Sequence, residues 1–188
     1  MYSSPFSRWQ KKPSKPPYED SQPFSQLYER VHLLVFRYIY GLHNGPREEA
    51  EDLTAETFTR AWNARRNFYG DESAAVGWLL KIARNLIIDT HRRTQVRPKV
   101  SAIPDDLDET LVSALDASPE AQTLQREQTR ILWQLLQTLP DPQREMLVLR
   151  YMLGWQVQEI GTHLNIPENT VSQTIRRVLA RLRERWID

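Results

Sequence analysis

Residues 156–175 read QVQEIGTHLNIPENTVSQTI, and their apolar spacing predicts two short helices joined by a tight turn. The small core between these helices would consist of Ile160, Leu164, Ile166, Val171 and Ile175. Gly161 costs about 1 kcal/mol of helix propensity relative to alanine, so we expect a packing reason such as close approach of the second helix. The pattern is that of a helix-turn-helix.

The second helix of this motif would expose polar and cationic side chains that can bond base edges and phosphates in a DNA major groove. These candidate contacts to duplex DNA are Asn169, Thr170, Ser172, Gln173, Arg176 and Arg177. An ordinary helical hairpin with a solvated polar face would show the same periodicity. The clustered arginines and the position of Gly161 favour DNA binding.

Charge is sorted along the chain, although the net charge is only +1. Basic residues concentrate in residues 81–99 and 176–185, whereas residues 100–125 contain no lysine or arginine and gather acidic residues. A helical adaptor that binds only proteins would not need two separated basic segments. The sorting therefore favours a protein that contacts nucleic acid through two regions.

The composition excludes several classes of protein. A chain of 188 residues, 40% of them hydrophobic, can form one ordinary core or two small ones. The absence of cysteine excludes disulfides, thiolate zinc sites and cysteine nucleophiles. Histidines lack metal-ligand spacing and no phosphate-binding loop is present, so we expect no metal, no cofactor and no enzymatic activity. Without a long apolar run or a signal peptide, the expected location is the cytoplasm.

Residues 24–96 are predicted to form a domain of three helices. The first has apolar residues at three-and-four spacing, namely Phe24, Leu27, Tyr28, Val31, Leu34, Val35, Tyr38 and Leu42. Asn44, Gly45 and Pro46 interrupt this pattern, and Pro46 suits the first turn of a second helix. Asp71 and Ser73 are candidate N-caps of a third helix that ends near Arg93.

The remaining segments complete an all-α chain of two small domains. Residues 1–23 are rich in proline and lysine and are expected to be a disordered arm. Residues 97–117 are expected to be an acidic linker. Residues 118–188 should form a four-helix domain, with helices beginning near Ser118, Asp141, Gln156 and Glu168. The inward-facing residues of its first helix would be Ala121, Leu124, Ile131, Leu135 and Leu139. The helix from Asp141 would carry Met146, Leu147, Tyr151 and Met152 and end at Gly154.

In their order and spacing, these segments resemble the extracytoplasmic-function (ECF) sigma factors. The resemblance is carried by residues 51–62 (EDLTAETFTRAW), 68–71 (FYGD), 77–89 (GWLLKIARNLIID) and the helix-turn-helix. It implies a subunit that binds core RNA polymerase and directs it to promoters. Residues 24–96 would be sigma region 2 and residues 118–188 sigma region 4, which reads the minus-thirty-five element. An anti-sigma factor is a further candidate partner.

The resemblance implies that residues 51–62 dock on the polymerase. The candidate contacts are Asp52, Leu53, Glu56 and Phe58. Asp52 and Glu56 lie four residues apart on one helix face and could meet basic residues of a partner. A merely solvated acidic stripe would have the same spacing.

The resemblance also implies that the segment after residue 67 melts and reads the minus-ten element. The candidate contacts are Phe68, Tyr69, Asp71, Ser73, Lys81, Arg84, Asn85, Arg92 and Arg93. Aromatic rings beside cations suit a melted strand with an extruded base. We expect the base pocket in the loop of residues 67–76, with Asp71 and Ser73 as its polar groups, and we expect Trp78 to belong to the core.

Some positions depart from the family pattern. Gln156 stands where a serine or threonine cap is usual, which should weaken the cap by about 1 kcal/mol, although Glu159 is placed to bond back. Residues 169–174 have two fewer cations than the usual pattern. The alternative interpretation is a dimeric helix-turn-helix regulator that acts without being a polymerase subunit.

Overall fold

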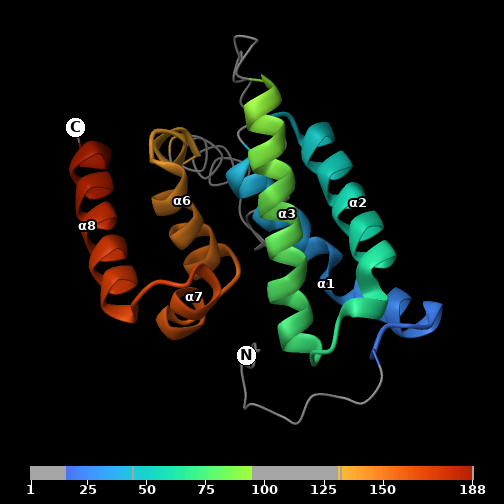
Figure 1. The fold of residues 1–188 in the computed structure, drawn as a ribbon. Coiled ribbons are helices and arrows are strands. Elements are labelled where there is room, and N and C mark those ends of the chain that lie inside the picture. The colour runs from blue at the N-terminus through green and yellow to red at the C-terminus, as the bar shows by residue number, and fades with distance from the viewer. Residues whose placement is uncertain (1–15, 44, 95–130, 132, 188) are drawn as a thin grey trace, which may run out of the picture. The chain divides into compact units, whose positions relative to one another are not determined.

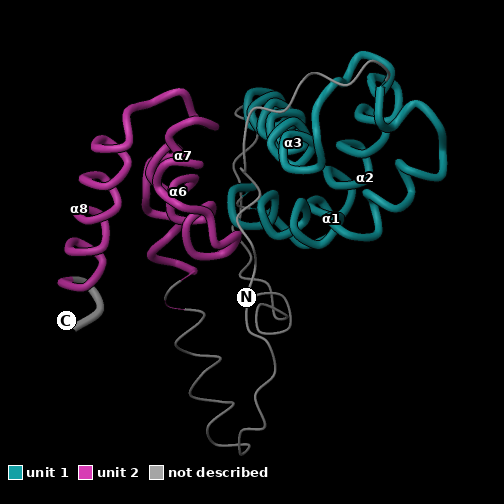
Figure 2. Tube along the Cα trace, turned by 90° about the horizontal axis from the view of Figure 1, so that it is seen from below, with its two compact units in different colours: residues 1–100 teal, residues 101–188 magenta. Residues whose placement is uncertain are grey.

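The computed structural model describes residues 16–43, 45–94, 131 and 133–187. The chain divides into two compact units, Met1–Val100 and Ser101–Asp188, which Figure 2 draws in different colours. Within the described ranges all regular structure is helical. The prediction of an all-α chain with two helical domains is confirmed.

The first unit contains three long helices: α1 (Ser21–Leu42), α2 (Arg47–Ala64) and α3 (Glu72–Thr94). Each contacts the other two (Figure 1), and a short 3-10 helix, η1 (Arg65–Asn67), continues α2. The predicted apolar stripes point inward and form one core. Its fully buried members include Leu27, Val35, Tyr38, Ile39, Ala50, Ala61, Leu79, Leu80 and Ala83.

Local signals set the starts of α2 and α3. Pro46 is the residue just before α2, one position outside the predicted first turn, and its fixed φ of −64° suits that place. Asp71 caps α3 as predicted, because its Oδ1 accepts a hydrogen bond from the backbone N–H of Ala74 at 2.8 Å. Ser73 lies inside the first turn, and its hydroxyl donates to the same oxygen at 2.7 Å.

The prediction of a disordered arm through residue 23 is wrong for residues 16–23. Tyr18 is only 6% exposed, and α1 already begins at Ser21. The buried ring removes enough apolar surface from water to order this short stretch. Residues 1–15, the predicted linker and the helix expected to begin at Ser118 lie outside the described residues.

The second unit contains α6 (Asp141–Leu147), a π-helical turn η2 (Val148–Met152), α7 (Val157–Leu164) and α8 (Glu168–Ile187). Residues 133–137 are also helical. Trp155, Leu149 and Ile160 are fully buried at its centre. Arg144 ties the incoming helix to α6, since its guanidinium donates to the carbonyl oxygens of Leu136 at 3.2 Å and Leu139 at 3.0 Å.

Two apolar residues named above for the predicted helices in this unit are exposed, and one of them, Ile131, was predicted to face inward. Tyr151 is 60% exposed and Ile131 is 37% exposed. The exposure of Tyr151 follows from the π turn. This turn has an extra residue and rotates the later side chains away from the face that α6 buries. The segment ends as predicted at Gly154, whose φ of 73° favours glycine.

Candidate nucleic-acid and polymerase interface

The predicted helix-turn-helix is present as α7, a turn and α8. The turn reverses at Asn165, whose φ is 57°, and the Ile166 N–H donates to the Gly161 carbonyl at 2.9 Å. A methyl group on Gly161 would lie 2.9 Å from the Ile166 carbonyl oxygen, so the expected packing reason for glycine is found. At the start of α7, Glu159 accepts a bond from the Gln156 N–H at 2.6 Å, as the sequence predicted.

One face of α8 is polar and exposed, and the opposite face is buried. The exposed candidates for duplex contact are Asn169, Thr170, Gln173, Arg176 and Arg177, and Ser172 is half-buried beside them. The buried face consists of Val171, Ile175, Val178 and Leu182. Arg181 is held away from this set, because it donates to the Gln143 side chain of α6 at 2.6 Å. The helix therefore presents an uninterrupted polar strip at its N-terminal half.

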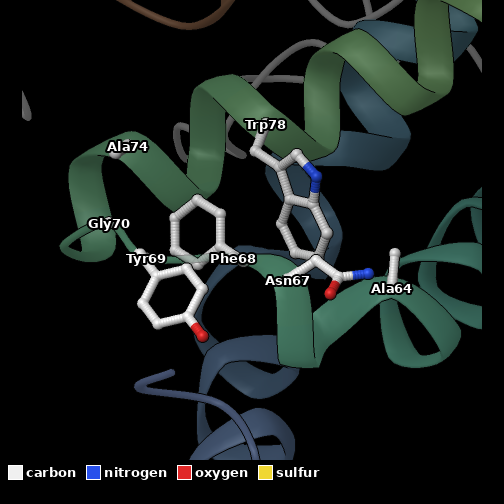
Figure 3. A pocket seen from close by; sticks show the side chains of 7 residues that line it. All are labelled: Ala64, Asn67, Phe68, Tyr69, Gly70, Ala74 and Trp78. Atoms are coloured by element: carbon white, nitrogen blue, oxygen red, sulfur yellow. The ribbon is translucent and has the colours of Figure 1, made fainter. Parts of the chain in front are cut away.

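A pocket of about 340 Å³ opens at the junction of η1 and α3 in the first unit. Its lining residues are Ala64, Asn67, Phe68, Tyr69, Gly70, Ala74 and Trp78, and Figure 3 shows the three rings among them. Phe68 and Trp78 are stacked, with their ring centroids 4.8 Å apart and an interplanar angle of 22°. Tyr69 is 40% exposed. The lining thus offers ring faces to a flat molecule.

The polar groups predicted for this pocket have a different first role. The bonds that Asp71 accepts from Ala74 and Ser73 fix the start of α3, and neither residue lines the pocket. Trp78, which we expected to be core, is half-buried and lines the pocket. Asp71 caps α3 because the first backbone N–H groups of a helix have no partner within the helix, and its carboxylate accepts a bond from one of them.

The pocket continues into a cationic strip along α3. Ala74 and Trp78 line the pocket, and Lys81, Asn85 and Arg92 follow them at spacings that keep all five on one helix face. These last three side chains are exposed, as is Arg93, while Arg84 is half-buried. Rings and cations thus share one surface.

The acidic face of α2 is exposed, but its apolar members are not equally accessible. Asp52 and Glu56 are exposed, and Glu56 pairs with Arg60 at 2.7 Å on the same helix. Leu53 is half-buried. Phe58 is 5% exposed, and its ring centroid lies 4.8 Å from that of Tyr28. Phe58 is therefore a core residue, and the prediction that it contacts the polymerase directly is corrected.

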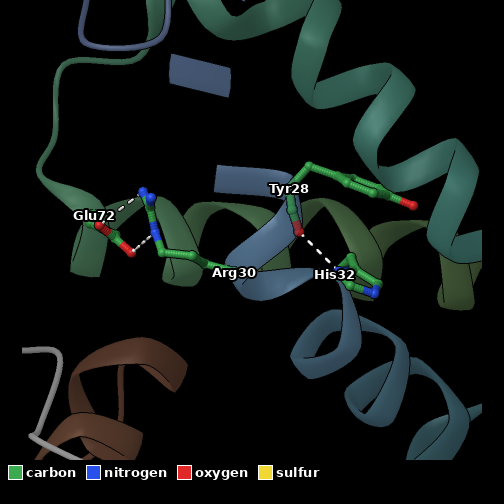
Figure 4. Close-up of polar contacts among 4 residues, drawn as sticks. All are labelled: Tyr28, Arg30, His32 and Glu72. Atoms are coloured by element: carbon green, nitrogen blue, oxygen red, sulfur yellow. Dashed lines mark hydrogen bonds and ion pairs between the residues drawn. The ribbon is translucent and has the colours of Figure 1, made fainter. Parts of the chain in front are cut away.

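Sequence reasoning missed the residues that back the pocket from the N-terminal side. Tyr18 stacks on Phe68 with ring centroids 5.9 Å apart. Arg30 of α1 pairs with Glu72 at the start of α3, with Nε to Oε1 at 2.8 Å (Figure 4). The sequence does not distinguish Tyr18 from the other aromatic residues of the proline-rich stretch, which are Tyr2, Phe6 and Trp9.

Two conserved-domain models match the chain: Sigma-70 region 2 matches residues 27–97, and Sigma-70 region 4 matches residues 129–182. SigW, an ECF RNA polymerase sigma factor of Bacillus subtilis, is 30% identical over 164 residues, which cover 85% of this chain and 84% of SigW. The chain belongs to the ECF sigma factor family.

Other sigma factors show the same likeness. SigX of Bacillus subtilis is 29% identical, covering 87% of this chain and 83% of SigX. SigE of Mycolicibacterium smegmatis is 35% identical, but the match spans only 56% of SigE. The fold is that of the sigma factor RpoE in its complex with the anti-sigma factor NepR from Bartonella quintana, with a TM-score of 0.64, 19% identity, and coverage of 87% of this chain and 96% of RpoE.

Membership of the family establishes the general function of the chain. Sigma factors act with RNA polymerase in promoter-specific initiation and are regulatory subunits, not catalysts, which agrees with the expectation that this chain is not an enzyme. The alternative of a regulator outside the polymerase is not supported. Within the described residues, no helix is long and apolar enough to cross a membrane, and no group of three or more histidine or acidic residues could hold a metal ion.

Proposed function

We propose that this sigma factor divides promoter recognition between its two units. The pocket and the cationic strip of α3 hold the melted strand of the minus-ten element, while the polar face of α8 reads the minus-thirty-five duplex. The acidic face of α2 docks on core polymerase. The observation that carries the proposal is the ring-lined pocket beside Lys81, Asn85 and Arg92.

The pocket suits a base that has left the stack. Extruding a base costs a few kcal/mol, and stacking on an aromatic ring returns about 1–3 kcal/mol per base. Tyr69 and Trp78 provide such faces, and a volume of about 340 Å³ is within the range of small-ligand sites. Lys81 and Arg92 then attract the phosphates of the strand that leaves the pocket. Asp71 and Ser73 support this role by fixing the start of α3, and the exposed Asp71 and half-buried Ser73 remain candidate partners of the base.

The face of α8 suits a rigid duplex. Asn169, Ser172 and Gln173 lie in its first two turns, which is the part of a recognition helix that enters the major groove. Asparagine and glutamine can bond adenine with two hydrogen bonds, and arginine can bond guanine or phosphate. Arg176 and Arg177 follow one turn later and would anchor the helix.

The acidic face of α2 suits a basic partner surface. Asp52 and Glu56 stand four residues apart and exposed, with the half-buried Leu53 beside them. Charges at the edge of an interface raise the association rate and fix orientation. The core of the unit lies directly beneath, so the face is rigid.

A transcription assay on two templates tests the division. Holoenzyme reconstituted from core polymerase would be assayed on a promoter selected from random DNA by the wild-type factor, both as duplex and with a pre-melted minus-ten bubble. Tyr69→Ala should lose activity on the duplex and recover part of it on the bubble, because the bubble removes most of the unpairing cost. The matched control is Tyr151→Ala, an exposed tyrosine of the second unit.

The arginine variant, in contrast, should not recover on the bubble template. Replacing Arg176 and Arg177 with alanine should weaken activity equally on both templates, because the upstream duplex is unchanged between them. If the Tyr69 and arginine variants respond identically to duplex and bubble, the division is refuted while the family assignment stands.

An anti-sigma factor is a proposed partner of this chain. Among the similar solved structures, RpoE is in complex with the anti-sigma factor NepR, and CnrH is in complex with the cytosolic domain of CnrY. CnrH has a TM-score of 0.57 and 23% identity to this chain. Co-purification of the tagged factor with a protein that blocks its binding to core polymerase would support this partner.

A further inference from the structure

The short segment before α1 is packed against the wall of the pocket. Residues 16–20 begin with a tight turn in which the Glu19 N–H donates to the Pro16 carbonyl at 3.3 Å. This turn directs the Tyr18 ring inward, where it is 6% exposed and stacked on Phe68. Phe68 is in turn stacked on Trp78, so three rings from three chain segments form a continuous stack. Two of these rings line the pocket, and Tyr18 does not.

The same segment is also bonded to η1, at a second border of the pocket. Arg65 of η1 donates from Nε to the Glu19 carbonyl at 2.9 Å and from Nη1 to the Trp62 carbonyl at 2.7 Å. Burial raises the pKa of Tyr18 to about 12, and the negative charge of Glu72 at the start of α3 adds to this rise. The segment thus contacts both η1 and Phe68.

We propose that residues 16–20 are a functional part of the minus-ten pocket, in which Tyr18 is a positioning residue that holds Phe68 in place for the unstacked base. This inference rests on the proposed function of the pocket. The segment lies before residue 27, where the match to the family model for region 2 begins. The backing of the pocket is therefore a feature of this chain that the family model does not cover.

The physical reason is preorganisation. A half-buried ring such as Phe68 can turn into an adjacent pocket unless its other neighbours hold it, and a pocket that must be emptied first binds its ligand more weakly. An aromatic pair adds about 0.5–1.5 kcal/mol beyond burial, which corresponds to about twofold to tenfold in an equilibrium. Loss of Tyr18 should lower base capture by a factor of this size.

A binding cycle with abasic strands tests the inference. The probe is the single-stranded oligonucleotide that binds wild-type holoenzyme most tightly from a random pool, prepared also with each base in turn removed from its sugar. In the wild type, one position should show a large loss of affinity when its base is removed. In Tyr18→Ala and Tyr18→Leu holoenzymes, this loss should shrink about twofold to tenfold, because the pocket no longer gains fully from that base.

Two control variants separate positioning from general stability. Tyr18→Phe keeps the ring and should keep the wild-type abasic profile. Val35→Ala removes buried volume from α1 at a fully buried position and should weaken the fold without changing which base matters or by how much. A merely structural role for Tyr18 would make Tyr18→Leu resemble Val35→Ala.

The possible failures are distinguishable. If the wild type shows no position that is sensitive to base removal, the pocket itself is refuted as a base site, and this inference falls with it. If the wild type shows such a position and Tyr18→Ala and Tyr18→Leu retain the full loss there, the pocket stands and the positioning role of Tyr18 is refuted.

Discussion

Replacing Gly161 with alanine should destabilise the helix-turn-helix, although alanine is the better helix former. By propensity alone, Gly161→Ala in α7 would stabilise the helix by about 1 kcal/mol. The added methyl carbon would lie 2.9 Å from the Ile166 carbonyl oxygen, several tenths of an ångström too close. The turn cannot move away easily, because Asn165 already has a φ of 57° and the Ile166 N–H is bonded to the Gly161 carbonyl. Overpacking of this kind costs about 1–3 kcal/mol, so the expected net loss is about 1 kcal/mol.

Hydrogen exchange of the full-length protein measures this loss locally. A net loss of about 1 kcal/mol should speed the exchange of protected amides in α7 and the first turns of α8 by about fivefold and leave α1 to α3 unchanged. The control is Thr162→Ala, an exposed neighbour in the same helix that already has a side chain, so that alanine adds no atom there. Slower exchange in Gly161→Ala, or exchange equal to that of Thr162→Ala, would show that the close approach does not constrain this position.

Three further predictions concern charged or titrating side chains. Asp52→Arg should lower affinity for core polymerase by about tenfold or more and leave the melting temperature unchanged, whereas Glu29→Arg on α1 should not change the affinity; equal affinities would remove the α2 face from the interface. Replacing Arg176 and Arg177 with alanine should make the slope of log duplex affinity against log salt concentration less steep. The change should correspond to the loss of about two phosphate contacts. Burial raises the pKa of Tyr18 from 10.0 to about 12, so its contribution to stability is complete below pH 10 and lost as pH rises toward 12; in urea unfolding, Tyr18→Phe should lose stability less steeply over that interval.

The sequence predicted the helix-turn-helix well because its determinants are local. Ile160, Val171 and Ile175 fall at helical spacing and are buried in the structure, and Gly161 was explained by an approach that the geometry then showed. The Glu159 bond to the Gln156 N–H also depends only on residues three apart. Each of these features can be derived from a window of about ten residues without knowledge of the rest of the fold.

The pocket was predicted less completely because it is assembled from distant segments. The structure has a pocket beside the loop of residues 67–76, where the sequence predicts a base site. The N-cap role predicted for Asp71 is confirmed, but Asp71 does not line this pocket, and its role toward a base stays a prediction. We expect Trp78 to belong to the core, but it is half-buried and lines the pocket, because a large ring in a helix can serve either place. Tyr18 lies in the segment predicted to be a disordered arm, because proline and lysine dominate the composition of residues 1–23 and nothing singles out Tyr18 among its aromatic residues.

This contrast follows from the proposed targets. A duplex is already ordered, so a single helix face with side chains at regular spacing is enough to read it, and that spacing is visible in the sequence. A melted strand is flexible, and capturing one of its bases requires a cavity whose walls are fixed before the base arrives. Such walls need contacts between segments far apart in the chain, here Tyr18 with Phe68 and Arg30 with Glu72. The residues that read a duplex should therefore be easier to predict from sequence than those that hold a single strand, and Tyr18 is the residue of this chain where that difference is greatest.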